Sequence, residues 1–188
     1  MFGGDSTLAS GTNTEIDQAP TMQDVLVDLQ LDAKTWQSGT PTRQAEWRLC
    51  LDEVVSEGIF GDGASPVTTG QRGLLDVLPT AVELTLRNGE GELLTTHRLP
   101  VQTLRPMMTE YMAIIRQMAR LPHGQNSPQL EALDIAKRIT HDEAGELVQS
   151  LLPSLRPSHG TARRIFTLLV TVFHDTTLIA VAHPIQPR

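Results

Sequence analysis

The sequence predicts an α+β fold in which a small antiparallel sheet with a central hairpin packs against a layer of four to five helices. Two observations lead to this class. Alternating apolar and polar residues over 82–99 predict the hairpin, and apolar residues at helical spacing over 103–174 predict a helical half. Because strands and helices are grouped along the chain and do not alternate, the order favours α+β over α/β.

The N-terminal segment differs in composition from the rest of the chain. Residues 1–20 are rich in Gly, Ser, Thr and Asp and have no hydrophobic period, which is typical of a disordered tail. A single α+β domain is therefore expected at 21–188. The 188 residues are about one domain by length, and a hydrophobic fraction of 39% is enough to build its core.

The first predicted elements are a strand and a helix. Apolar residues alternate with polar ones over 25–31, which predicts a strand with Val25, Val27, Leu29 and Leu31 on one face. Residues 42–57 carry apolar side chains at helical spacing, directly after Pro41. The Gly-rich stretch at 58–80 predicts a loop that holds one short strand at 74–78.

The hairpin is the clearest local signal. Val82, Leu84 and Leu86 alternate with polar residues, and a second alternating run follows at 93–99. Asn-Gly-Glu-Gly at 88–91 separates the two runs and supplies the positive φ angles that a tight turn needs.

The helical half is predicted to contain four helices. The first starts at Thr103, and Ser127-Pro128 is typical of the start of a second. Thr-His-Asp-Glu at 140–143 matches a capping box and predicts the start of a third. The last helix, 161–173, is apolar nearly all round and is expected in the middle of the core. A short strand is predicted at 177–182.

Composition and charge exclude several classes of function. The formal net charge is −7, which disfavours binding to nucleic acid and to anionic membranes. The longest apolar run, 165–173, is too short to span a bilayer. Cys50 is the only cysteine, so neither an internal disulfide nor a thiolate metal cluster can form. No signal peptide is visible, and a cytoplasmic location is expected.

Arg163 and Arg164 form the first candidate site. They are placed in the first turn of the last helix, where a cation opposes the helix dipole. A carboxylate of the chain would compensate for this, and that interpretation is favoured. The alternative is a bound anion held by the helix-end amides and the two guanidinium groups, with His141 nearby. The expected carboxylate partners are Glu143, Asp142, Glu110 and Asp134.

The second candidate is a metal site. His141, Glu143 and His174 are residue types that bind transition metals. The competing interpretation is structural, because Glu143 fits the capping box and a cation at His174 suits the C-terminal end of a helix. The structural interpretation is favoured for both residues.

The sequence contains no phosphate-binding loop, dinucleotide fingerprint, nucleophile elbow or zinc-ligand spacing. We therefore expect a non-catalytic interaction or accessory protein without a cofactor, whose partner is another protein or a second copy of the chain. A module or small enzyme that binds a small anion through Arg163, Arg164 and His141 is the alternative.

Four sequence blocks carry a resemblance to a known family. They are Leu-Arg-Pro-Met-Met-Thr-Glu-Tyr at 104–111, Gln-Leu-Glu-Ala-Leu-Asp-Ile-Ala-Lys-Arg at 129–138, His-Asp-Glu-Ala-Gly at 141–145 and Thr-Ala-Arg-Arg-Ile-Phe-Thr-Leu at 161–168. With them the stretch 93–174 resembles an uncharacterised protein family of alphaproteobacteria, family zero-two-six-two. The chain differs from the family in the Gly-rich segment before the hairpin and in the tail after His174. The resemblance implies a fold and a compartment but no reaction.

Overall fold

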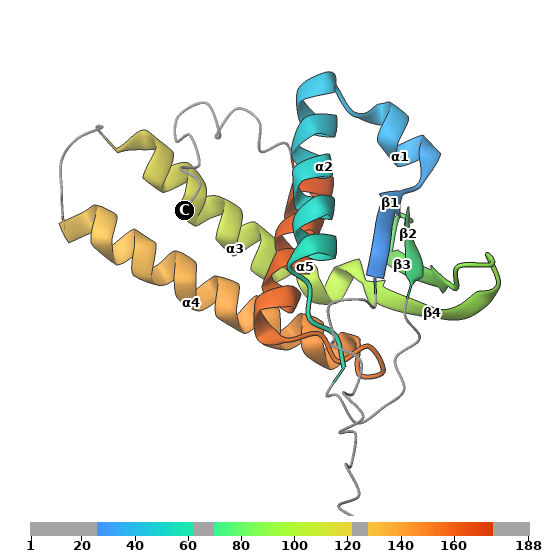
Figure 1. Cartoon of the computed structure of the whole chain (residues 1–188). Coiled ribbons are helices and arrows are strands. Elements are labelled where there is room, and N and C mark those ends of the chain that lie inside the picture. Colours follow the sequence, from blue (N-terminus) through green and yellow to red (C-terminus); the bar gives the residue numbers. More distant parts are fainter. Residues whose placement is uncertain (1–25, 62–69, 122–127, 175–188) are drawn as a thin grey trace, which may run out of the picture.

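The structure, a computed structural model, describes residues 26–61, 70–121 and 128–174. The sheet lies on one side of the helices (Figure 1). In chain order the elements are β1 (Leu26–Leu31), α1 (Ala33–Ser38), α2 (Pro41–Ser56), β2 (Gln71–Val77), β3 (Ala81–Arg87), β4 (Leu93–Pro100), α3 (Val101–Arg120), α4 (Pro128–Leu151) and α5 (His159–Phe173). The predicted α+β class is confirmed. The predicted tail at 1–20 and the predicted strand at 177–182 lie outside the described residues.

The four strands are arranged in the order β1-β2-β3-β4. The pairs β2–β3 and β3–β4 are antiparallel, whereas β1 runs parallel to β2. The predicted antiparallel arrangement is therefore confirmed for two pairs and wrong for the pair β1–β2. α1 and α2 lie between β1 and β2 in the chain, and such a helical crossover returns the chain to the same end of the sheet.

β1 departs from a regular alternation near its start. The pairing register with β2 shifts between Leu26 and Asp28, which places a bulge at Val27. Leu29 and Leu31 are buried as predicted, but Val27 is 51% exposed and Leu26 is buried. The bulge therefore turns Val27 away from the face that the sequence pattern assigned to it.

The predicted hairpin is confirmed as β3 and β4. The amide of Gly91 donates to the carbonyl of Asn88 at 3.0 Å. The Asn88 side-chain oxygen accepts the amides of Glu90 and Glu92 at 3.0 and 2.9 Å. Of the two turn glycines, Gly91 adopts a positive φ of 87°, and Gly89 does not. The Asn88 side chain thus takes over part of the role that the sequence assigned to a second left-handed glycine.

α2 matches the predicted helix, and Thr40 caps it by accepting the amide of Arg43 at 3.3 Å. The six-residue α1 was not predicted. It is held by Asp32, whose side chain accepts the amide of Thr35 at 2.9 Å. β2 starts at Gln71, several residues before the predicted strand, because pairing with both β1 and β3 extends it.

α4 is one continuous helix, so the predicted break at the capping box is wrong. Thr140 is 3% exposed, and its hydroxyl lies 3.5 Å from Glu110 Oε1 of α3. Within an unbroken helix each amide bonds to the carbonyl four residues earlier. No free amide is therefore left at residues 140–143 for a cap to satisfy.

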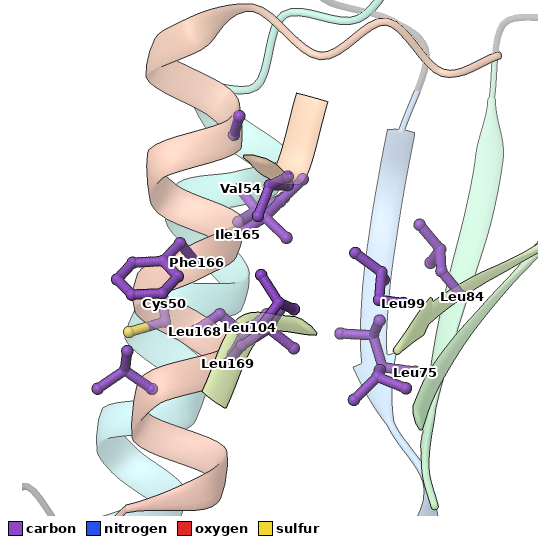
Figure 2. Close-up of a cluster of buried hydrophobic side chains, with 14 of the residues drawn as sticks. Cys50, Val54, Leu75, Leu84, Leu99, Leu104, Ile165, Phe166, Leu168 and Leu169 are labelled. Carbon is purple, nitrogen blue, oxygen red and sulfur yellow. The ribbon is translucent and has the colours of Figure 1, made fainter. Parts of the chain in front are cut away.

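α5 is central to the core, as its sequence predicts. Ile165, Phe166, Leu168, Leu169 and Val170 are all buried. Figure 2 shows Leu75, Leu84 and Leu99 of the sheet facing Ile165, Leu168 and Leu169 of α5. A cavity of about 20 Å³ remains between these two layers, and its lining is almost wholly apolar. That volume is near one water molecule and offers no space for a ligand.

None of the described helices combines the length and the hydrophobicity needed to cross a bilayer.

Candidate functional site

The two arginines lie one turn further into α5 than predicted. α5 starts at His159, and the hydroxyl of the N-cap Ser158 accepts the amide of Thr161 at 3.2 Å. Arg163 and Arg164 are therefore in the second turn. The helix dipole acts mainly on the first turn, so the charge conflict is smaller than the sequence implied.

Both guanidinium groups reach a carboxylate of the chain. Arg163 Nη1 lies 3.3 Å from Asp142 Oδ1 on α4. Arg164 pairs with Glu57, which follows the last residue of α2. Asp142 was among the expected partners, and Glu57 was not. The arginine side chains are 37% and 32% exposed, so each pair contributes roughly 1 kcal/mol or less to stability.

His141 lies between α4 and α5 with both ring nitrogens engaged. Its Nδ1 accepts hydrogen bonds from Arg163 Nε and Nη2, at 3.2 and 3.1 Å. Its Nε2 lies 2.9 Å from the hydroxyl of Thr167 and 3.1 Å from the carbonyl of Arg163. Because a guanidinium group can only donate, Nδ1 carries no proton and the neutral ring holds its proton on Nε2.

The surroundings of His141 keep the ring neutral. Burial and the charge of Arg163 lower the pKa of His141 to about 4. Its ring also lies 5.3 Å from Tyr111 and 5.8 Å from Phe166, measured between ring centroids. Tyr111 meets Phe166 edge-on, at 5.7 Å and an interplanar angle of 82°. His141 therefore closes an aromatic cluster that joins α3, α4 and α5.

A surface hollow of about 310 Å³ lies beside this cluster. We call it the arginine hollow; it is lined by Glu53, His141, Gly160, Arg163, Arg164 and Thr167. Its two cations are opposed by Glu53 and by the ion-pair partners Asp142 and Glu57. The structure thus brings together the three residues predicted for anion binding, but in surroundings whose positive charge is largely balanced.

The same geometry limits what these residues can do chemically. The Nδ1 lone pair of His141 faces a guanidinium group, so it is not available as a general base. Cys50 is buried, and burial together with the charges of Glu53 and Glu46 raises the pKa of its thiol to about 11. This thiol remains protonated at neutral pH and is a poor nucleophile.

The predicted metal site is not formed. Among the described residues, which include His141, Glu143 and His174, no three His, Cys, Asp or Glu side chains are close enough to hold a metal ion. His141 and Glu143 are two positions apart on one helix and point to different sides. His141 contacts Thr167, and His174 follows seven residues later, about 10 Å along α5.

His174 is the C-cap of α5, as the structural interpretation predicted, and its amide donates to the carbonyl of Val170 at 2.8 Å. The His174 ring does not carry the positive charge that was expected at the C-terminal end of this helix. Burial lowers the pKa of His174, and the charges of Arg116 and Arg105 lower it in the same direction. The ring is therefore neutral near pH 7.

A second and larger hollow lies where the sheet ends at β1. Its volume is about 720 Å³. Residues of β1, α1, α2 and β2 line it. The first three elements follow one another closely in the chain, and β2 comes after a longer interval. We call it the β1 groove; its polar and aromatic side chains include Asp28, Asp32, Trp36, Arg48, Asp52 and Asp76.

The β1 groove is acidic. Burial alone would raise the pKa of Asp32, but hydrogen bonds from Thr35 and from the amides of Val77 and Lys34 outweigh this effect and lower the pKa. Asp28 accepts a hydrogen bond from Gln30 at 2.8 Å. The cation Arg48 lies over the ring of Trp36, 5.1 Å from its centroid.

Sequence reasoning missed the β1 groove. Its four aspartates come from β1, the end of β1, α2 and β2, and no spacing along the chain brings such residues together. One signal was present in the sequence. The polar residues Asp28 and Gln30 alternate with Leu29 and Leu31, which marks one side of β1 as solvated.

Comparisons with known proteins identify the family of the chain. The sequence model of an uncharacterised protein family, UPF0262, matches residues 23–175. The chain belongs to this family. The UPF0262 match covers β1 and α2 as well as the helical half, so it extends well beyond the stretch 93–174 on which the resemblance was based.

Three UPF0262 proteins of alphaproteobacteria illustrate the similarity. One from Bradyrhizobium sp. (strain ORS 278) is 27% identical over 154 residues, which cover 79% of this chain and 89% of the relative. One from Methylobacterium radiotolerans is 27% identical over 146 residues, which cover 77% of this chain and 89% of the relative. One from Brucella anthropi is 27% identical over 150 residues, or 79% and 92%. No solved structure shows a significant match.

Proposed function

We propose that this protein is a non-catalytic interaction protein that binds a protein partner along the open edge of β1. One observation carries the proposal. Among the described strands β1 and β4 each have a neighbour on one side only, and the 720 Å³ of the β1 groove lie beside β1. An unpaired sheet edge exposes backbone donors and acceptors that pair readily with an added strand.

The backbone of β1 fits this mode of binding. The amide of Asp32 donates to the carbonyl of Leu75 on β2 at 2.9 Å. Backbone groups of successive residues point to opposite sides of a strand, so those of Leu29 and Leu31 face away from β2. Both residues also line the β1 groove. A partner strand in the groove would therefore meet two backbone donors and two acceptors.

A cytoplasmic location is part of this proposal. Cys50 is the only cysteine in the chain, and it is buried and protonated. This cysteine usage suits a reducing compartment.

Site-specific crosslinking in the cells of origin tests the proposal. A photoreactive residue in place of Gln30, which lines the β1 groove and is exposed, is expected to give a discrete protein adduct. The same residue in place of Glu146, which is exposed on α4, is expected to give none. The adducts are detected by a shift in electrophoretic mobility and identified by mass spectrometry.

Two further substitutions make the crosslinking result specific. Ala33 is exposed at the start of α1 and lines the β1 groove, so Ala33→Trp is expected to fill the groove and remove the Gln30 adduct. Ala132→Trp, at an exposed position of α4, is expected to leave the adduct unchanged. A missing Gln30 adduct, or one that persists in the Ala33→Trp protein, would contradict the proposal.

We also propose a second candidate function, in which the arginine hollow holds a small phosphate-like anion. The observation that favours it is that Arg163 and Arg164 line the same hollow and are both partly exposed. An incoming anion would replace the carboxylate of Glu57 or Asp142. Guanidinium groups bind the oxygens of phosphate with two parallel hydrogen bonds, which suits this class of ligand.

A thermal-shift titration with inorganic phosphate tests the second candidate. Phosphate at a concentration of a hundred times its Kd would stabilise the folded protein by about 2.7 kcal/mol, which raises Tm by several degrees. The Arg163→Ala/Arg164→Ala protein is expected to lose this shift, and an Arg72→Ala/Arg105→Ala control to keep it. Equal shifts in both variants, or no shift beyond that of chloride at the same ionic strength, would exclude the anion site.

A further inference from the structure

We infer that the partner segment bound in the β1 groove is an extended peptide that carries lysine or arginine on both of its faces. This inference rests on the proposed function and adds the chemistry of the partner. It starts from the charge of the groove, whose four aspartates face a single arginine, Arg48.

Two of the four carboxylates are ready to bind a cation. The Asp32 carboxylate already accepts hydrogen bonds from the amides of Thr35 and Val77. The Asp28 carboxylate accepts one from the side chain of Gln30. Asp52 and Asp76 form no ion pair within the part of the chain that the structure describes. The groove therefore holds negative charge that the described fold does not neutralise, and it is complementary to a cationic ligand.

The two open carboxylates lie on different sides of β1. Asp52 belongs to α2, beside Leu51 and on the side of the helices. Asp76 belongs to β2 and pairs in register with Glu83 on β3, which in turn pairs with Arg98. Leu75 beside it is buried against α5, so Asp76 points to the opposite face of the sheet.

A strand added next to β1 projects its own side chains alternately to these two faces. Cations on the face toward α2 would meet Asp52, and those on the outer face would meet Asp76. Trp36 and Leu51 supply apolar surface for the stems of lysine or arginine side chains. The geometry therefore selects a basic and extended segment over a helical one.

The same charges argue against a second copy of this chain in the groove. A symmetric edge-to-edge dimer would bring the aspartates of one β1 groove toward those of the other. The chain as a whole carries a net charge of −7, so long-range repulsion adds to this local conflict. A cationic partner is attracted both by the aspartates of the groove and by the negative net charge of the chain.

Isothermal titration of the full-length protein with a defined peptide tests the inference. The probe is an eight-residue peptide, blocked at both ends, in which pairs of arginines alternate with pairs of threonines, so that arginines project to both faces of the strand. A peptide with glutamine in place of each arginine is its neutral match. The arginine peptide is expected to bind in low salt and to weaken as salt is raised, and the glutamine peptide to bind at least tenfold more weakly. Equal affinity for the two peptides would overturn the choice of a cationic partner and leave the proposed edge interaction intact.

Two protein variants locate the binding site. Asp52→Asn/Asp76→Asn is expected to weaken binding of the arginine peptide about tenfold, since it removes both open carboxylates. Glu131→Gln/Glu146→Gln makes the same change in net charge at exposed positions of α4 and is expected to leave the affinity unchanged. Equal weakening in the two variants would show a non-specific attraction and overturn the inference.

A modified peptide separates this inference from the proposed function. Methylation of alternate backbone amides keeps the charges of the arginine peptide but removes the hydrogen bonds of an added strand. Binding is expected to be lost. A methylated peptide that binds as tightly as the parent would contradict strand addition itself, which is the binding mode on which the proposed function depends.

Discussion

Replacing Trp47 by alanine is expected to lower the free energy of unfolding by about 3–5 kcal/mol. The Trp47 side chain is 1% exposed in the middle of α2. Its indole Nε1 donates to the carbonyl of Thr171 on α5 at 2.9 Å. Arg43 lies over its ring at 4.9 Å, and the ring of Trp36 is 6.2 Å away. Alanine would leave a large cavity where α2 meets α5, and urea unfolding followed by circular dichroism measures the loss.

Two variants support the interpretation of this loss. Trp47→Phe keeps a ring in place, and Arg43 Nη2 still donates to the Thr171 carbonyl at 3.2 Å, so a smaller loss of about 1–2 kcal/mol is expected. Leu49 is on the same helix but 52% exposed, so Leu49→Ala is expected to change stability by about 0.5 kcal/mol or less. A Trp47→Ala protein within 1 kcal/mol of the wild type would contradict the packing of α2 on α5.

Stability is expected to fall as the pH decreases from about 6.5 to about 4, on account of His141. The folded-state pKa of His141 is about 4, whereas the unfolded chain takes up this proton near 6.5. Between the two values the unfolded state binds more protons, so lowering the pH favours unfolding. With allowance for the partial exposure of the ring, the loss is on the order of 2 kcal/mol. Below about pH 4 both states are protonated and the contribution stays constant.

A His141→Gln variant isolates this contribution. Burial also lowers the pKa of His97 and His174, so these residues add to the same trend in both proteins. Glutamine takes up no proton in this range, so the stability of the variant is expected to decrease less steeply between pH 6.5 and 4. Urea unfolding at several pH values within this interval gives the two slopes. Equal slopes would show that His141 is not held neutral by burial and Arg163.

The candidate sites were predictable to different degrees. Arg163, Arg164 and His141 were singled out from the sequence, and the fold brings them together around one hollow. The partner of Arg164 was not predictable, because Glu57 is more than a hundred residues away in the chain. The β1 groove was missed for the same reason, since Asp76 joins the aspartates of β1 and α2 only when β2 pairs with β1.

What the sequence by itself determined are the elements whose causes are local. The alternation around the Asn-Gly turn specifies the β3–β4 hairpin, Thr40 and Pro41 specify the start of α2, and an apolar surface on all sides places α5 in the core. In each case the residues that decide the structure are close neighbours in the chain.

Only the tertiary structure decided the parallel pairing of β1 with β2, the bulge at Val27, the continuity of α4 through Thr140 and the open edge with its groove. Each of these depends on contacts between segments that are distant in sequence. The residue pattern of a segment shows which face it buries, but the partner that covers this face, and the edge that stays open, follow from the packing of the whole chain.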